Sequence, residues 1–258
     1  MTGFQLTATL WFESSFHIGT GLSGSGADRT VRSHEENFSD DEEEDDPPRN
    51  DSKTKRRTIP EISGEAVKGS IRGSAERIVR WLIQPKDPIE KQFFEKKLLE
   101  EEDNSLPRHP ALQRIFAWQS LNGRDGNPPA SYRFSTPRYL EGGRLFATAT
   151  TAINAESGVA EKNTLRVMQH WSANAYFAVT IDGRGGDWAN VASQDYLDLV
   201  LLVAAFVATA QVGGKKGNGL GETTAGSLYL SPMAKPELDA ATLARLRTSL
   251  IEELRKHA

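Results

Sequence analysis

Glycine and lysine are concentrated in residues 212–221, which read VGGKKGNGLG. Glycines let the backbone adopt positive φ and approach a ligand closely, and exposed amides beside lysines form a concavity that favours phosphate. The spacing is not that of a nucleotide-hydrolase phosphate loop, in which glycine and lysine are followed at once by serine or threonine. We therefore expect phosphate contact without nucleotide hydrolysis; a plain flexible turn is the alternative. The expected contacts are Gly213, Gly214, Lys215, Lys216, Gly217 and Asn218.

A second basic group lies on a predicted helix over residues 63–83, with Ser63 as its N-cap. Lys68 and Arg72 are four residues apart and therefore share one helical face. They lie in the N-terminal half of the helix, where the helix dipole also favours anions. This pattern predicts a phosphate cradle, with an ordinary solvated helix face as the alternative.

Composition limits the possible classes of protein. The 258 residues are 38% hydrophobic and 26% charged, which is ordinary for a globular protein with a sizeable core. The absence of cysteine excludes disulfides, zinc–thiolate sites and thiol catalysis. The first residues lack a signal-peptide pattern, and the longest apolar run, residues 199–208, is too short to cross a bilayer. We therefore expect a cytoplasmic protein.

The net charge of −4 is unevenly distributed. Residues 35–51 hold ten acidic residues and one arginine, so the remainder carries a net +5. Such a basic body can bind a polyanion. Residues 34–58 contain too little apolar surface for a core, and we expect a disordered acidic insertion there. A solubilising loop is favoured over an interaction tail.

Hydrophobic periodicity predicts an α+β fold in a single domain, residues 1–258. In order, the expected core is strand, helix, strand, strand, helix, strand, the ferredoxin-like (RRM-like) βαββαβ pattern. The core elements are residues 4–12, 63–83, 144–153, 174–182, 193–211 and 223–231. A helical and loop insertion is expected over residues 89–143, with helices at 89–103 and about 110–118, and a terminal helix at 236–257. The open face of such a sheet commonly binds RNA.

Four segments together resemble the RAMP superfamily of CRISPR-associated proteins, in particular the backbone subunit (Csm/Cmr-type, Cas-seven-like) of type III effector complexes. They are FHIGTGL at residues 16–22, IPEISGEAVKGSIRGS at 59–74, TATTAINAESGVAEKNTLRVM at 148–168 and VGGKKGNGLGE at 212–222. They occur in the family's order across most of the chain. Residues 61–65 depart from the family's usual glycine–serine run, and the acidic insertion is not typical of it.

The resemblance implies a guide-RNA (crRNA) binding subunit of an antiviral-defence ribonucleoprotein. Its partners would be other effector subunits, copies of itself or close paralogues, and complementary target RNA, with no membrane. His17 and Gly19 join the RNA-binding set, although local packing beneath the loop is the favoured role for the His17 ring. Residues 149–170 would be the thumb hairpin, with Asn163, Leu165 and Arg166 against the distorted duplex.

The resemblance also implies endoribonuclease activity, with Asp28 as the catalytic and metal-binding residue for cleavage of target RNA with Mg²⁺ or Mn²⁺. Asp28 cannot hold a metal ion alone and would need phosphates of the RNA. A turn-capping aspartate in a non-catalytic guide-binding or capping subunit is the alternative. A metal-independent endonuclease that processes precursor guide RNA would use the same fold, but the histidine-poor loop region argues against it. A ferredoxin-like enzyme or regulatory domain without RNA is a further alternative.

Overall fold

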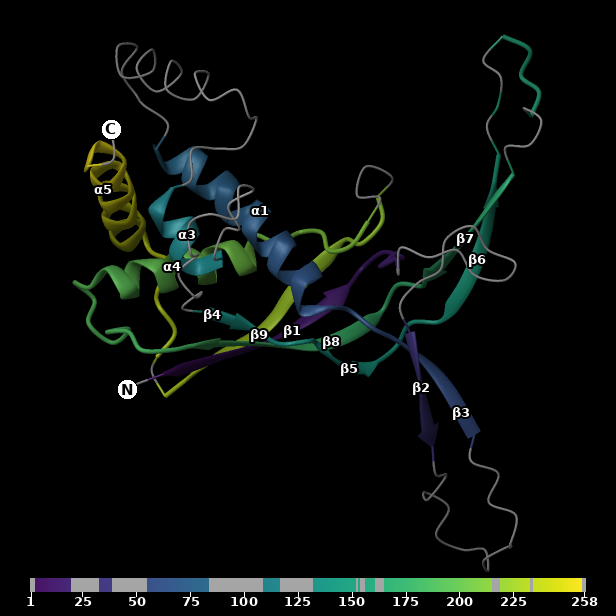
Figure 1. Ribbon diagram of the computed structural model, residues 1–258, viewed down its shortest axis with the longest axis horizontal. Helices are drawn as coiled ribbons and strands as arrows, with labels where there is room; N and C mark the ends of the chain where they lie inside the picture. The colour runs from purple at the N-terminus through teal and green to yellow at the C-terminus, as the bar shows by residue number, and fades with distance from the viewer. Residues whose placement is uncertain are drawn as a thin grey trace, which may run out of the picture.

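The structure is a computed structural model that describes residues 3–19, 33–38, 55–83, 109–116, 132–151, 153, 156–160, 165–214, 219–232 and 234–256. Its strands are β1 Phe4–Phe12, β2 Ser33–Phe38, β3 Lys55–Pro60, β4 Tyr132–Phe134, β5 Arg138–Glu141, β6 Leu145–Thr150, β7 Arg166–Trp171, β8 Ala175–Gly183 and β9 Thr223–Ser231. Its helices are α1 Gly64–Ile83, α3 Pro110–Phe116, α4 Gln194–Val207 and α5 Ala240–Lys256. Figure 1 shows their arrangement.

The main sheet is antiparallel and has the order β4-β8-β1-β9, with β5 also paired to β8. Strand β1 lies in the centre and pairs with β8 along its whole length, from Phe4 opposite Gly183 to Phe12 opposite Ala175. With α1 between β1 and β4, and α4 between β8 and β9, the chain follows the βαββαβ order of a ferredoxin-like fold. The predicted fold class is therefore confirmed.

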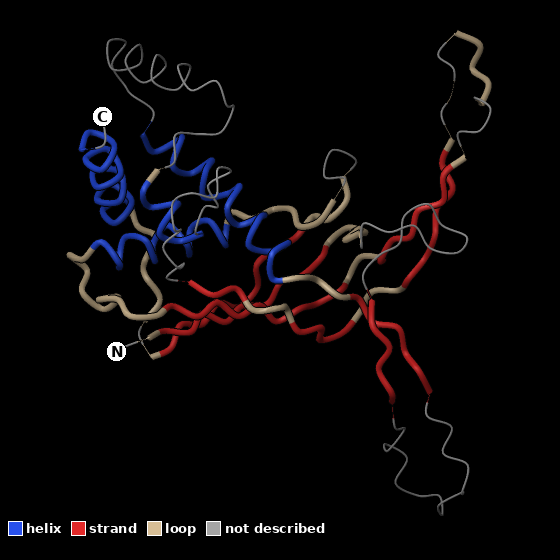
Figure 2. Tube along the Cα trace, viewed as in Figure 1, coloured by secondary structure: helices blue, strands red, loops and turns tan. Residues whose placement is uncertain are grey.

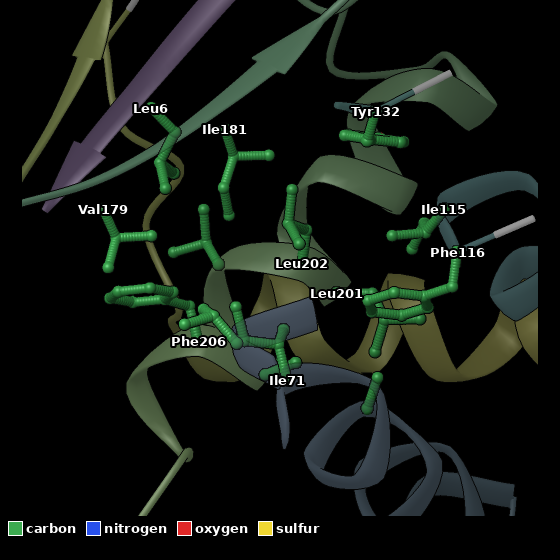
Figure 3. Packing of buried hydrophobic residues seen from close by; sticks show 14 of the residues in the cluster. Leu6, Ile71, Ile115, Phe116, Tyr132, Val179, Ile181, Leu201, Leu202 and Phe206 are labelled. Carbon is green, nitrogen blue, oxygen red and sulfur yellow. The ribbon is translucent and has the colours of Figure 1, made fainter. Parts of the chain in front are cut away.

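The helices cover one face of the sheet, as Figure 2 shows. The inward residues of β1 and β8 alternate with outward ones, and α1 and α4 bury their apolar sides against them. Figure 3 shows Leu6, Val179 and Ile181 from the sheet facing Phe206 of α4 and Ile71 of α1. Because β1, β8, α1 and α4 share this one hydrophobic core, its packing determines how both helices are oriented across the sheet.

The second core strand differs from the prediction. We expected residues 144–153 in the sheet, but β6 pairs only with β7 as a separate hairpin. Its place beside β8 is taken by β4 and β5, within residues 104–143, which were expected to be largely loop. Alternation predicts that a segment is a strand but does not say which sheet it joins, and strands of three and four residues carry almost no periodic signal. The short helix expected near residues 110–118 is present as α3.

Two hairpins project from the body in different directions (Figure 1). One is β6–β7, in the region of the expected thumb. The other is β2–β3, in which Ser33 pairs with Pro60 and Phe38 with Lys55. The expected disordered insertion therefore differs from the structure at its two ends, which form this ladder. Residues 39–54, and the helix expected at 89–103, lie outside the described residues.

A buried ion pair joins the helices behind the sheet. Arg114 of α3 donates two hydrogen bonds to Asp198 of α4, at 2.6 and 2.8 Å, and its Nη1 lies 2.8 Å from Oε1 of Glu253 on α5. Asp198 also accepts a hydrogen bond from the Gln194 side chain. Burial raises the pKa of Asp198 above 3.8, and the hydrogen bonds from Arg114 oppose that rise. The ionised carboxylate therefore depends on the arginine.

Replacing Arg114 with Met should lower the free energy of unfolding by about 3 kcal/mol at neutral pH, because Asp198 would stay buried without its counter-ion. Burial already raises the pKa of Asp198 in the folded chain, and loss of Arg114 would raise it further. The variant therefore loses stability as the pH increases from the pKa of the unfolded chain through the higher pKa of the folded chain. The deficit of the variant should thus shrink below about pH 4, where the carboxyl is protonated in both states. Urea unfolding across pH measures this. Arg184→Met, at an exposed position, is the control. If Arg114→Met lowered the free energy of unfolding equally at neutral pH and below about pH 4, the prediction would be wrong.

Candidate nucleic-acid interface

The chain leaves β1 into a short segment, residues 13–18, which we call the strap. On one side it lies against the segment that joins α4 to β9: the amide of Glu13 donates to the Glu222 carbonyl, and the amide of Gly221 donates to the Ser15 carbonyl. On the other side Phe16 pairs with Trp171 at the end of β7. The strap therefore joins the glycine-rich segment to the base of the β6–β7 hairpin.

The described ends of the glycine-rich segment have the backbone conformation that glycine permits. Gly213 and Gly221 have φ of 101° and 76°. A Cβ on Gly213 would lie 2.8 Å from the His17 carbonyl oxygen, and one on Gly221 would lie 2.1 Å from that of Val212. These two glycines lie at the base of the loop, and the close approach of neighbouring backbone there explains why both positions are glycine. The expected contacts Lys215, Lys216, Gly217 and Asn218 lie outside the described residues.

Helix α1 begins as predicted, with the Ser63 hydroxyl accepting from the Ala66 amide at 3.2 Å. Gly64 lies directly against β4, where a Cβ would lie 2.7 Å from the Phe134 carbonyl oxygen. Lys68 and Arg72 then follow on one side of the helix. Lys68 lies 3.7 Å from Glu65, and Arg72 lies 3.6 Å from Glu76. Pairs of this kind at a surface contribute at most about 1 kcal/mol, so a phosphate can replace the carboxylate.

A pocket of about 190 Å³ lies between α1 and the residues that enter the glycine-rich segment. Its lining is Gly69, Ser70, Gly73 and Arg77 of α1, with Ala210 and Gln211. A Cβ on Gly69 or Gly73 would meet no atom within 4 Å. The pocket therefore places residues 69–77 of α1, which follow Lys68, beside the residues that lead into the glycine-rich segment. Figure 1 shows that segment between α1 and the β6–β7 hairpin.

Sequence reasoning missed Arg77 and Gln211 as members of this surface. Arg77 is exposed, and its Nη2 donates to the Ser74 hydroxyl, which also accepts from Thr209. The signal that could have found this surface is the pair of glycines four residues apart inside a helix, where glycine is unfavourable by about 1 kcal/mol relative to alanine.

His17 occupies a different environment from that of a surface RNA contact. It is 5% exposed, its ring Nδ1 lies 2.8 Å from the Gln169 carbonyl oxygen, and its own carbonyl accepts from the Gly214 amide. This is the local packing favoured for His17 by the sequence. Gly19, at the end of the described strap region, is exposed.

The expected thumb residues are described in part. Leu165 and Arg166 are exposed at the start of β7, and Ile153 and Val159 are exposed apolar residues near the same end of the hairpin. Asn163 and Asp28 lie outside the described residues. Among the residues that the structure describes, no group of three acidic or histidine side chains could hold a metal ion. Within the same residues, no helix is long and apolar enough to span a membrane.

The sequence matches no family model, and no curated protein matches it. The structure is similar to a solved chain titled "Type IV-B CRISPR Complex", with a TM-score of 0.52 over 93% of this chain and 96% of that chain. The two sequences are 15% identical, so the similarity concerns the fold. The shared architecture agrees with the ferredoxin-like core described above.

Proposed function

We propose that the protein is a guide-RNA-binding subunit of a CRISPR ribonucleoprotein, acting together with other effector subunits. The observation that carries the proposal is the pocket on α1, in which Gly69, Gly73 and Arg77 face Ala210 and Gln211 at the entry to the glycine-rich segment. Lys68 and Arg72 directly precede the two glycines on α1, and we call the pocket together with these two residues the groove. The fold similarity to a CRISPR-complex chain supports the same class of protein. The groove offers cations and accessible backbone but few groups able to read a base, which suits a strand bound through its phosphates.

The first test is salt-dependent binding of a single-stranded RNA by the purified chain. The double variant Lys68→Ala, Arg72→Ala should bind about tenfold more weakly, and the slope of log affinity against log salt should fall by about 1.4, the value for two phosphate contacts on a single strand. Arg184→Ala is the matched control, because this exposed arginine follows the end of β8 opposite to the strap. Salt-independent binding, or equal losses in both proteins, would refute the proposed groove.

The two open glycines give a second test, in which one substitution should raise the stability of the chain and weaken its binding of RNA. Gly73→Ala should raise the stability of the free chain by about 0.5–1 kcal/mol, because alanine is the better helix former and the new methyl meets no atom. The same methyl would stand in the path of a ribose–phosphate backbone on α1 and should weaken RNA binding severalfold. Thermal unfolding and RNA titration on one preparation measure both effects. A variant that is stabilised and binds RNA as tightly as the wild type would show that the pocket lies off the RNA path.

The subtype of the complex is a finer part of the proposal. The sequence motifs resemble the repeating backbone subunit of type III complexes, whereas the chain similar in fold comes from a type IV-B complex. The motifs favour a subunit that holds guide RNA and contacts other effector subunits and further copies or paralogues, and the fold similarity supports a chain of a CRISPR complex. Co-expression with the guide RNA and neighbouring subunits, followed by determination of the stoichiometry, identifies the position in the assembly.

Cleavage of complementary RNA is the second function that we propose, with Asp28 as its catalytic residue and Mg²⁺ or Mn²⁺ as the ion. The supporting observation is the end of the strap, where the His17 carbonyl accepts the Gly214 amide of the glycine-rich segment and the exposed Gly19 follows. Asp28 follows nine residues after Gly19, a chain length of at most roughly 30 Å from Gly19. A carboxylate there could orient the ribose 2′-hydroxyl or share a divalent ion with the RNA phosphates.

Asp28→Ala should reduce target cleavage by the assembled complex about 100-fold or more, the range for loss of a general base, while guide binding stays at the wild-type level. The measurement is single-turnover cleavage of a complementary RNA with Mg²⁺ or Mn²⁺. Asp40→Ala in the acidic run is the control for a nearby loss of charge. Wild-type cleavage by Asp28→Ala would leave the non-catalytic guide-binding subunit as the function.

A further inference from the structure

Trp171 at the end of β7 is 2% exposed and packs in the core, and beyond this residue the β6–β7 hairpin has few contacts that fix its direction. Its strands pack mainly on each other, and two chain connections join it to the body, through Arg144 and through Ser172. At these connections the Arg144 amide donates to the Ser172 hydroxyl, and the Ser172 amide donates to the Arg144 carbonyl. Two adjacent chain connections at the base can act as a hinge about which the outer part of the hairpin tilts. A third attachment further from the base restricts this tilt.

The strap supplies this third attachment. Phe16 and Trp171 exchange two backbone hydrogen bonds of 2.9 Å each. One step further from the base of the hairpin, the His17 ring bonds to the Gln169 carbonyl oxygen at 2.8 Å. Because a carbonyl only accepts, Nδ1 must carry the hydrogen. The ring centroid also lies 5.8 Å from that of His170, whose Nε2 is 2.9 Å from the Thr148 hydroxyl on β6.

His17 also holds the opposite side of the junction. Its carbonyl accepts the Gly214 amide at 2.8 Å, and Gly213 fits above that carbonyl only because it lacks a side chain. One buried residue is therefore bonded to the glycine-rich segment through its backbone and to the hairpin through its ring. Neither bond is part of the main sheet, so the fold itself does not require them.

We propose that His17 is a positioning residue that fixes the β6–β7 hairpin relative to the glycine-rich segment. A nucleic-acid strand held by that segment and α1 then meets the hairpin at one defined position. This use of the link rests on the proposed function, whereas the link itself is a property of the free chain.

The experiment measures the direction of the hairpin in the absence of RNA. The chain contains no cysteine, so Ala149→Cys on β6 and Ala244→Cys on α5, both exposed, take two spin labels and no others. Pulsed electron paramagnetic resonance gives the distribution of distances between the labels. It is recorded for otherwise wild-type chain, for His17→Phe, which keeps a flat ring without the donor, and for His17→Asn, which keeps a short side-chain N–H donor.

The expected result is one narrow distribution for the wild type, about a twofold broadening for His17→Phe, as for a released hinge, and a return towards the narrow distribution for His17→Asn. Melting temperatures are recorded beside the widths. A purely structural role would lower the melting temperature of both variants without separating their widths, and that outcome overturns the proposal. A broad distribution in the wild type overturns it without any variant. If the wild-type chain does not bind RNA, the proposed function is wrong. The widths of the distance distributions are recorded without RNA and still test the role of His17.

Discussion

The register of β1 is the constraint on which the rest of the structure depends. Strand β1 pairs with β8 on one side and β9 on the other, and its inward residues from Phe4 to Phe12 are almost wholly buried. A slip of one residue would turn this set to the outer face and empty the core. Because the strap continues directly from β1, the same register decides where residues 13–18 meet the glycine-rich segment and the hairpin. The core thus positions the start of the strap, from which the contacts of His17 reach the glycine-rich segment and the hairpin.

Helix α1 serves the core and the groove with different faces. Val67, Ile71 and Ala75 are buried against the sheet and α4, and this packing holds the helix in place. Three glycines weaken the helix intrinsically, and they have different explanations. Gly64 is required by the close approach of β4, whereas Gly69 and Gly73 face open space. Gly69 and Gly73 thus lower the helix propensity of α1 at positions where the fold does not require glycine. Glycines at such positions suit a surface that the backbone of a ligand must approach closely.

The sequence predicts the regular elements of the core well and their partners less well. Strong alternation in β1 and β8, the Ser63 cap and the apolar run of α4 each identify an element near its observed position. The place of β6 outside the main sheet was not predictable, because alternation fixes the type of an element and not its neighbour. The strands β4 and β5 are too short for any periodic signal.

The candidate site shows the same division. Lys68 and Arg72 share a face because helical spacing alone determines it, and the glycine-rich segment lies close by through the connection from α4. The environment of His17 depends on its contact with Gln169, and the pocket is lined by Arg77 together with Gln211, residues that are far apart in the chain. No local pattern carries that information. Long-range pairs of this kind are set by the register of the sheet.

Under the proposed function, the charges of Lys68 and Arg72 indicate how tightly one copy of the chain would bind RNA. In the free chain Lys68 and Arg72 lie near glutamates of their own helix, so phosphate binding exchanges one weak ion pair for another and gains mainly by release of counter-ions from the RNA. A few such exchanges give modest affinity that falls steeply with salt. Several subunits bound along one RNA act through a shared effective concentration and can hold it far more tightly without any new contact. Under the proposed function, a groove that binds RNA through its phosphates would therefore suit repeated copies or paralogues on one strand, each placing a hairpin at a defined position.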